Sequence, residues 1–501
     1  MLLHWGLMFH FNLAKDMKNI KTIIKNVSLL AVLACGLSSC SDSFLEVTPK
    51  GKLIADQTAD YDLLLNNKAL LELFLNGQVQ AYLGDELDAI NPYFDAGYLR
   101  SKRLFSYTDV IYERNENAEE ITDLMKNLYT YNKIINEVMD SQNGSEAQKK
   151  AIRAEALVGR AWANLLLINY YGKPYTDASA ATDPGFPIIL NSDVMQTTFT
   201  RASVGQVYEL ILNDLTTAIP DLPKRLTHRL RASKSAGEGI LAKAYIYMGK
   251  FDKALPLLES AIANIANAGI PVKLIDQNEA FAPGGIYLPL NPYIGPTNIA
   301  SIELTDNIYA RHYPINISSF NNDLVLSKEA SALFQEDDLR RNFMSTTPLF
   351  VAQEYPDGRL RRIGPMTVQI GVTLADLYLL RAECKARLND LAGAKADVEF
   401  LRKNRMPAAS VAVPANIASQ RVSLLKFILE ERIREFAGQG YRWFDMRRLS
   451  VDPLFSNVTY KHQVFDMDGK VVATFPLKPE RFTLQLPPKV IDLNPGMENN
   501  P

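Results

Sequence analysis

Cysteine and histidine are scarce in this chain, which has only three and five of them among its 501 residues. The cysteines are Cys35, Cys40 and Cys384. If residues 1–39 are removed and Cys40 is modified, no intramolecular disulfide can form. Cys384 follows Leu377 on an apolar helical face, so we expect a buried core thiol and not a nucleophile.

Patterns typical of catalytic and metal sites are also missing. The histidines beyond residue 39 are His228, His312 and His462, which lie far apart without cysteine or carboxylate at metal-ligand spacing. The sequence has no GxSxG, no GxGxxG and no phosphate-binding loop. We therefore expect no metal, no cofactor and no catalytic residues.

Neither sign of charge is in large excess. The chain has 54 basic and 56 acidic residues, and because residues 1–39 hold four lysines and one aspartate, the remainder is slightly acidic. Nucleic acid is therefore not an expected partner. An apolar share of 47% is enough for a large globular core or two fused ones.

No apolar run is long enough to cross a membrane. The run from Val27 to Leu37 has about half of the roughly 20 residues that a spanning helix needs. Basic residues precede it and small residues follow it, which is the order of a secretory signal peptide. We expect residues 17–39 to be this signal, Met17 to be the native start, and residues 1–16 to be an upstream extension.

Cys40 directly follows Leu37, Ser38 and Ser39, an arrangement similar to the bacterial lipobox, in which the cysteine is acylated and becomes the mature N-terminus. We predict lipidation of Cys40, with residues 40–51 as the tether. Each buried methylene contributes about 0.8 kcal/mol, so two or three acyl chains hold a folded body firmly. Cys35 fits the pattern less well, and an ordinary signal peptide with an incidental cysteine is the alternative.

Helical patterns dominate the remainder of the chain. Residues 238–265 combine small residues in two apolar helical runs with Gly249 between them, as in a tetratricopeptide unit. Residues 373–405 form a second pair, with one apolar face and a turn at Asn389. Further helices are expected at residues 121–139, 147–172 and 207–219. The expected apolar face of the second pair consists of Leu374, Leu377, Tyr378, Cys384 and Leu388.

Residues 270–320 are rich in proline and lose the helical period, so we expect a long irregular segment, which is usually functional in a compact protein. Small hairpins are expected at residues 356–359 and 466–470. The second resembles a calcium loop, but Val464 stands where the first aspartate would be, so we favour a turn.

Residues 424–449 combine an apolar stripe with charged groups that can pair across a turn at Gly438 and Gly440. We expect Glu431, Arg432 and Glu435 to pair with the second charged group, and this favours a structural motif over a pair of catalytic carboxylates. The expected stripe is Val422, Leu425, Leu429, Ile433 and Phe436, and the second charged group is Arg442, Asp445 and Arg448.

The motif, the lipobox and the helical pairs together resemble the SusD/RagB family of outer-membrane nutrient-binding lipoproteins. Gln439 departs from the family, where a glutamate is more usual. Agreement extends to "YYGKPY" at 170–175, to Tyr131 and Asn132, and to the ending "LPPKVIDLNPGMENNP". The motif positions that match are Glu431, Arg432, Glu435, Gly440, Arg442, Asp445 and Arg448.

The resemblance implies a mainly α fold of tetratricopeptide-like helical pairs, with irregular loops and a few short β-hairpins. It divides the body at residues 52–501 into an N-terminal region, about 52–235, and a RagB/SusD region, about 236–501, with repeats and ligand loops. It also implies a binding protein and not an enzyme: a lipid-anchored protein of the outer membrane, exposed at the cell surface, that takes up oligosaccharide with a SusC-like TonB-dependent barrel.

Ligand contacts in this family come from loops, which match residues 82–98 and the proline-rich segment here. Trp162 and Trp443 lie within helical patterns, so tyrosine is the expected stacking residue. The alternatives are that each aromatic residue only packs its own loop, that the protein is a surface glycosidase, or that it is a repeat scaffold without a soluble ligand. The candidate ligand residues are Asp85, Asn91, Tyr93, Tyr98, Tyr287 and Tyr293.

Overall fold

The computed structural model describes residues 55–74, 77–293, 295–296, 304–315 and 321–501. The predicted signal peptide, Cys40 and the tether lie outside these described residues. No helix among the described residues has both the length and the apolar character needed to cross a bilayer.

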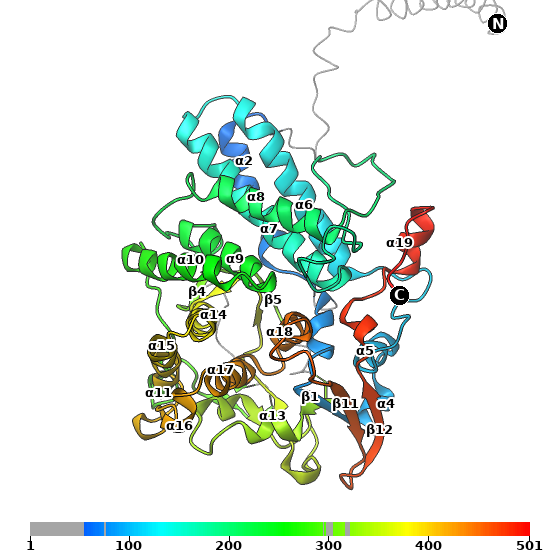
Figure 1. The fold of residues 1–501 in the computed structure, drawn as a ribbon, viewed down its shortest axis with the longest axis vertical. Helices are drawn as coiled ribbons and strands as arrows, with labels where there is room; N and C mark the ends of the chain where they lie inside the picture. The colour runs from blue at the N-terminus through cyan, green and yellow to red at the C-terminus, as the bar shows by residue number, and fades with distance from the viewer. Residues whose placement is uncertain (1–54, 75–76, 294, 297–303, 316–320) are drawn as a thin grey trace, which may run out of the picture. The chain divides into compact units, whose positions relative to one another are not determined.

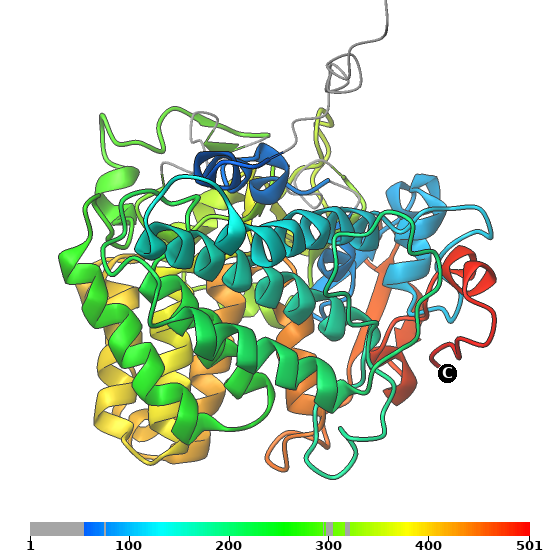
Figure 2. The same ribbon diagram turned by 90° about the horizontal axis from the view of Figure 1, so that it is seen from above.

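Helices are the main regular structure of the described residues, 48% of which are helical, and the long ones are arranged as antiparallel pairs (Figure 1), which confirms the expected mainly α fold. Neighbours in sequence pack on each other, and α10 also packs on α14, so that the early and late pairs lie side by side (Figure 2). The main helices are α6 (Glu119–Glu137), α7 (Glu146–Tyr171), α8 (Val204–Ala218), α9 (Lys234–Tyr247), α10 (Phe251–Asn264), α14 (Leu374–Arg387), α15 (Leu391–Lys403), α17 (Arg421–Phe436) and α18 (Tyr441–Ser450).

Local sequence explains where these helices begin and turn. The Oγ of Ser145 accepts a hydrogen bond from Gln148 N, and Gln148 Oε1 accepts one from Ser145 N, which is a capping box at the start of α7. Gly249 has a φ of 72° between α9 and α10, a left-handed conformation that glycine adopts without strain. The expected helical pairs at 238–265 and 373–405 are therefore confirmed.

Two details of the expected apolar faces are wrong. Leu388 is 45% exposed at the end of α14, and Val422 is 39% exposed in the first turn of α17. Helix α17 instead buries Leu424 and Ile428, because it packs against several helices and not along one stripe. Cys384 is a buried free thiol as expected, and burial raises its pKa.

The largest sheet has four short strands in the order β12, β11, β1, β6. Strand β1 (Leu87–Ile90) runs parallel to β11 (Lys461–Phe465) and antiparallel to β6 (Leu324–Leu326). Strand β12 (Val471–Pro476) forms the expected hairpin with β11. The Asp466 carboxylate accepts hydrogen bonds from Asp468 N and Lys470 N, so residues 466–470 form a turn stabilised by its own aspartate.

The segment expected to be irregular contains only short elements among its described residues.

The turn at 356–359 lies near the end of a long connection between β7 and β8, and it does not close a tight hairpin. The short strands and helices are β2 (Leu290–Asn291), β3 (Gly295–Pro296), β4 (Asn307–Tyr309), β5 (His312–Tyr313), β7 (Met344–Ser345), β8 (Arg361–Arg362), β9 (Val368–Gln369), β10 (Val372–Thr373), α2 (Thr58–Leu64), α3 (Lys68–Leu71), α4 (Tyr93–Ala96), α5 (Leu99–Phe105), α11 (Gln277–Ala280), α13 (Lys328–Ala332), α16 (Ala415–Ala418) and α19 (Pro488–Leu493).

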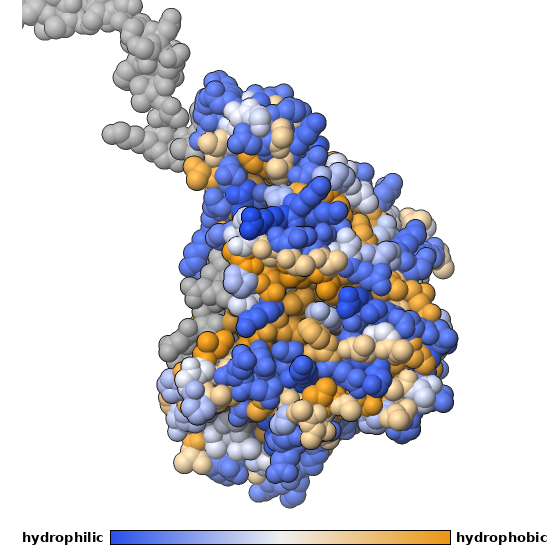
Figure 3. All heavy atoms as spheres, turned by 90° about the vertical axis from the view of Figure 1, so that its left-hand side faces the viewer, coloured by the Kyte–Doolittle hydropathy of each residue, from blue (hydrophilic) through white to orange (hydrophobic). Residues whose placement is uncertain are grey.

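One face of the molecule shows how the helices divide polar from apolar residues. In Figure 3, hydrophobic side chains gather in a hollowed band across the middle of that face, with hydrophilic side chains above and below it. This is the distribution expected when paired helices turn their charged faces outward and their apolar stripes toward one another.

Helix α17 carries a network of buried ion pairs. Glu431 is fully buried, and three arginines contact it: Arg340 at 2.7 Å, Arg402 at 2.9 Å and Arg434 at 2.9 Å. Burial alone would raise the pKa of Glu431, but these guanidinium groups lower it to about 2. Glu431 is therefore a charge held in the core by positive partners.

A second branch of this network joins α17 to α18. Arg432 contacts Asp445 at 2.7 Å and Asp376 at 2.8 Å, and Arg448 contacts both Asp445 and Glu383. The expected pairing of Arg432 with Asp445 across the glycine turn is confirmed.

Two other pairings differ from the expectation. Glu431 and Glu435 bind arginines outside the motif, including Arg340 and Arg405, because these side chains reach into the core from other segments. Arg442 pairs with Asp85 instead of with a glutamate of α17.

Replacing Glu431 by Gln should destabilise the fold by about 3–5 kcal/mol, because three buried arginines lose their shared counter-charge. The matched control is Glu430→Gln, since Glu430 is the preceding residue on the same helix and its side chain is 44% exposed. The measurement is urea unfolding of both variants at neutral pH. Equal stability of the two variants would contradict a structural role for Glu431.

Candidate functional site

Three of the expected ligand residues lie on the loop that follows β1. Asn91 N donates to Phe465 O at 2.8 Å, which fixes the start of this loop to the end of β11. The ring of Tyr93 packs edge-on against Tyr355, and Tyr98, the residue before α5, is 82% exposed. The loop therefore presents Asn91, Tyr93 and Tyr98 beyond the C-terminal ends of β1 and β11.

A second arm beside this loop is built from residues 321–323 and 347–355. The Asn322 side chain donates to Leu349 O and accepts from Leu349 N, and Tyr355 OH donates to Asn322 O at 2.9 Å. These bonds fix the turn that carries Phe350, which is 82% exposed and has a φ of 61°. A large apolar ring held outward in a left-handed conformation suggests a ligand contact.

Tyr293 joins this arm. Its ring centroid lies 5.6 Å from that of Phe350, and its carbonyl oxygen accepts a hydrogen bond from Arg361 at 3.0 Å. We call the surface formed by Asn91, Tyr93, Tyr98, Tyr293 and Phe350 the aromatic face. Sequence reasoning missed Phe350; the available signal was an aromatic residue among the polar and turn-forming residues of 345–358.

The structure places the two remaining candidates elsewhere. Tyr287 is only 4% exposed, with its ring packed on Phe281 and Phe343, so it offers no face to a ligand. Asp85 precedes β1 at the opposite end of the strand, and its carboxylate binds Arg442 at 2.6 Å. The expectation for Tyr287 is corrected, because an apolar cluster buries it. Asp85 stays a prediction: its side chain is 24% exposed and pairs with Arg442, away from the loop that carries Tyr98.

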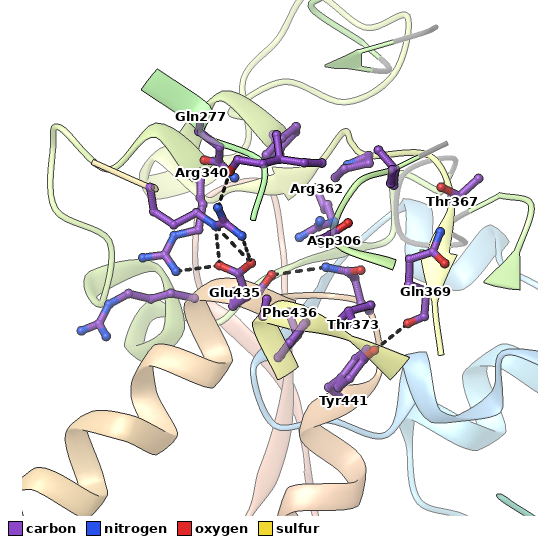
Figure 4. Close-up of a pocket in the computed structure, with 18 of the residues that line it drawn as sticks. Gln277, Asp306, Arg340, Arg362, Thr367, Gln369, Thr373, Glu435, Phe436 and Tyr441 are labelled. Carbon is purple, nitrogen blue, oxygen red and sulfur yellow. Dashed lines mark hydrogen bonds and ion pairs between the residues drawn. The ribbon is translucent and has the colours of Figure 1, made fainter. Parts of the chain in front are cut away.

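Tyr287 lines a small internal cavity beside the α17 network (Figure 4). Its volume is about 80 Å³, well below the 300–1,000 Å³ usual for ligand pockets, so it is suited to a few water molecules and not to a sugar ring. Asp306 lies in its wall, where burial raises the pKa of this carboxyl to about 6 despite the nearby Arg405.

Buried carboxyl groups lie at both ends of β1. Burial, followed by the charge of Asp85, raises the pKa of Glu86 to about 7 at the N-terminal end. Burial raises the pKa of Asp323 to about 6 at the C-terminal end, where a Cβ atom added to Gly97 would lie 3.5 Å from Asp323 Oδ2. Asp323 thus lies directly under the loop that carries Tyr98.

The comparisons with known proteins agree with this architecture. The family model described as "SusD family" matches residues 373–501, and the model described as "Starch-binding associating with outer membrane" matches residues 43–246. The chain belongs to the SusD/RagB family. The family binds carbohydrate and is associated with the outer membrane.

Relatives of known name or structure are distant. SusD-like protein P2 of Formosa agariphila is 23% identical over 358 residues, which cover 62% of this chain and 67% of that protein. A SusD superfamily protein of Bacteroides thetaiotaomicron has a TM-score of 0.66 at 19% identity, covering 89% of this chain and 100% of the other. A SusD-like carbohydrate binding protein of Bacteroides vulgatus has a TM-score of 0.62 at 16% identity, with 88% and 99% covered. These structures share the fold.

The carboxylates of the SusD motif are unsuited to hydrolysis. A glycosidase needs two carboxyl groups that flank a bond in an open cleft. Glu431, Glu435 and Asp445 are instead buried, and each is paired with at least two arginines. Among the described residues, no cluster of three or more histidine, cysteine or acidic side chains is arranged to hold a metal ion.

The raised pKa values of Glu86 and Asp323 predict a pH-dependent stability. The folded state binds these two protons more tightly than the unfolded state does. Their contribution to the free energy of unfolding is therefore complete below about pH 4 and is lost as the pH rises through about 6 to 7. In urea unfolding at pH 4.5, 6 and 7.5, the free energy of unfolding of the wild type minus that of Glu86→Gln should therefore fall as the pH rises. This difference separates the carboxyl group from His312 and His462, whose lowered pKa values act in the opposite direction. A difference that stays constant across this pH range would contradict the assignment.

Proposed function

We propose that this SusD/RagB protein binds oligosaccharide on its aromatic face at the cell surface and passes it to a SusC-like TonB-dependent barrel for uptake. The observation that carries the proposal is the pair of outward rings, Tyr98 and Phe350, each 82% exposed. Aromatic rings pack against the apolar face of a sugar ring.

The rigidity of the face supports ligand binding over a purely structural role. Exposed rings on mobile loops would lose conformational freedom on binding, whereas here Asn322 and Tyr355 already fix the turn of Phe350. The alternative is a repeat scaffold that binds no soluble ligand. It would leave these exposed rings without a role.

Lipidation of Cys40 is the proposed means of attachment. Acyl chains on this sulfur would hold the body at the outer membrane with residues 40–51 as the tether, and no spanning helix is needed. We propose the outer leaflet as the site, since the aromatic face can meet extracellular glycans only there.

Alanine at Tyr98 and at Phe350 should each weaken glycan binding by about 3- to 10-fold, because one aromatic contact contributes about 0.5–1.5 kcal/mol. The probes are maltoheptaose and soluble starch, chosen from the family description, together with xylan, mannan and laminarin. The measurement is calorimetry, with affinity gel electrophoresis for the polymers. The matched control is Tyr129→Ala, since Tyr129 is 41% exposed on α6, away from the face. Equal losses in the control, or no loss at either ring, would count against the aromatic face.

Cys40→Ala should release the protein from membranes, because alanine has no sulfur to carry the acyl chains. Fractionation of expressing cells should find the variant in the soluble fraction, and mass spectrometry of the wild type should find acyl chains at Cys40. Cys35→Ala is the control and should stay with the membrane. An unmodified Cys40 thiol in the wild type would refute the anchor.

A further inference from the structure

Three hollows lie in line along residues 451–460, which we call the ridge loop. The first has a volume of about 310 Å³, the central one about 770 Å³ and the third about 290 Å³. Thr176 and Val451 line both the first and the central hollow, while Val458 and Tyr460 line both the central and the third. The hollows are therefore neighbours along the ridge loop, and we call the three together the groove; the central hollow by itself has the volume of a ligand site.

The groove is separate from the aromatic face. Strands β1 and β11 are parallel, so their N-terminal ends share one edge of the sheet and their C-terminal ends share the other. Tyr460 and Asp85 line the groove just before these strands begin, whereas Asn91 follows the end of β1. A ligand in the groove would leave the aromatic face free.

Hydroxyl and amide groups line the central hollow beside apolar walls. The walls include Val451, Val458, Leu477 and Phe482, and the volume falls within the usual range of 300–1,000 Å³ for ligand sites. Such a mixture suits a molecule that has apolar ring faces and many hydroxyl groups. The hydroxyl and amide groups belong to Thr176, Ser179, Ser456, Asn457, Thr459 and Thr483.

Charge along the groove disfavours an anionic ligand. In the central hollow Lys173 is paired with Asp183 at 2.7 Å, and in the first hollow Arg387 is paired with Asp452 at 2.6 Å. The third hollow adds the carboxylates of Glu329 and Glu430 beside the single ammonium group of Lys426, and the central hollow adds Glu480. A neutral polymer is the ligand that this charge pattern accepts.

The walls are preformed. Phe482 stacks on Trp443 at 6.0 Å between ring centroids and lies 5.9 Å from the ring of Tyr460. Leu477 N donates to Tyr460 O at 2.9 Å, and Leu484 N donates to Tyr170 O at 2.9 Å. The groove therefore needs little ordering when a ligand enters.

We propose that this groove is a second saccharide site, which takes a linear neutral oligosaccharide along the ridge loop. The inference rests on the proposed function for its ligand class. An extended peptide is the other linear candidate, but peptides commonly add to a free strand edge. Among the residues that line the three hollows, none belongs to β11 or β12, so the groove itself offers no strand edge.

The test is calorimetry of the full chain with maltohexaose, xylohexaose, mannohexaose and laminarihexaose. Val451→Lys combined with Val458→Lys places charged chains at both junctions between hollows. The matched control is Val471→Lys combined with Val472→Lys, since these valines of β12 are 49% and 51% exposed and lie outside the groove. Thr459→Lys is a milder second blocking variant.

For the hexasaccharide that binds the wild type, the calorimetric stoichiometry should be about two molecules per protein chain. In either blocking variant it should fall to about one molecule per chain. The control variant should still bind two molecules per chain. The double variant Tyr98→Ala with Phe350→Ala should lose the molecule bound at the aromatic face and keep the one in the groove. A single site that is lost with the aromatic face and is unaffected by blocking would overturn the groove while sustaining the proposed function. No binding of any hexasaccharide would overturn both. An apolar octapeptide library that binds the wild type but not the blocking variants would reassign the groove to peptide.

Discussion

The body of this protein depends on keeping charge in its core. Glu431 has no exposed surface and contacts Arg340, Arg402 and Arg434, which come from a connecting turn, from α15 and from α17 itself. A lone buried charge is very costly, so these segments must come together in one arrangement before the charges are matched. Replacement by apolar residues can give equal or greater stability in other proteins, so we infer that this network serves chiefly to specify the arrangement of segments.

The same network positions the aromatic face, the proposed ligand surface. Arg432 and Arg448 tie α17 and α14 to Asp445 of α18, and Arg442 of α18 pairs with Asp85 just before β1. Strand β1 then runs through the sheet, between β11 and β6, to the loop of the aromatic face. A short rigid strand therefore connects the buried charges at one edge with the exposed rings at the other, and this explains why the family motif lies far in sequence from the rings.

Sequence reasoning succeeded where the decisive interactions are local. The helical period and Gly249, which has a positive φ, predicted the pair α9 and α10. The ion pair between Arg432 and Asp445 was also predicted, because a single turn separates the helices that carry these two residues. It failed where distant segments compete for the same side chain. Arg340 precedes Glu431 by about 90 residues and carries no local signal of its role. Similarly, Tyr287 and Phe350 both lie in irregular segments, and only long-range packing buries the first and exposes the second.

The placement of the aromatic face and the ridge-loop groove has a physical consequence for long ligands. Four residues of β1 separate the two edges of the sheet, a span of about 13 Å along the strand. In the proposed scheme, a glycan long enough to pass around the sheet contacts both sites of one molecule, and the second contact is then intramolecular, with a high effective concentration. A short oligosaccharide can occupy only one site at a time. Chain length alone would thus favour retention of polymers at the surface, while short fragments leave more readily for the next step of uptake.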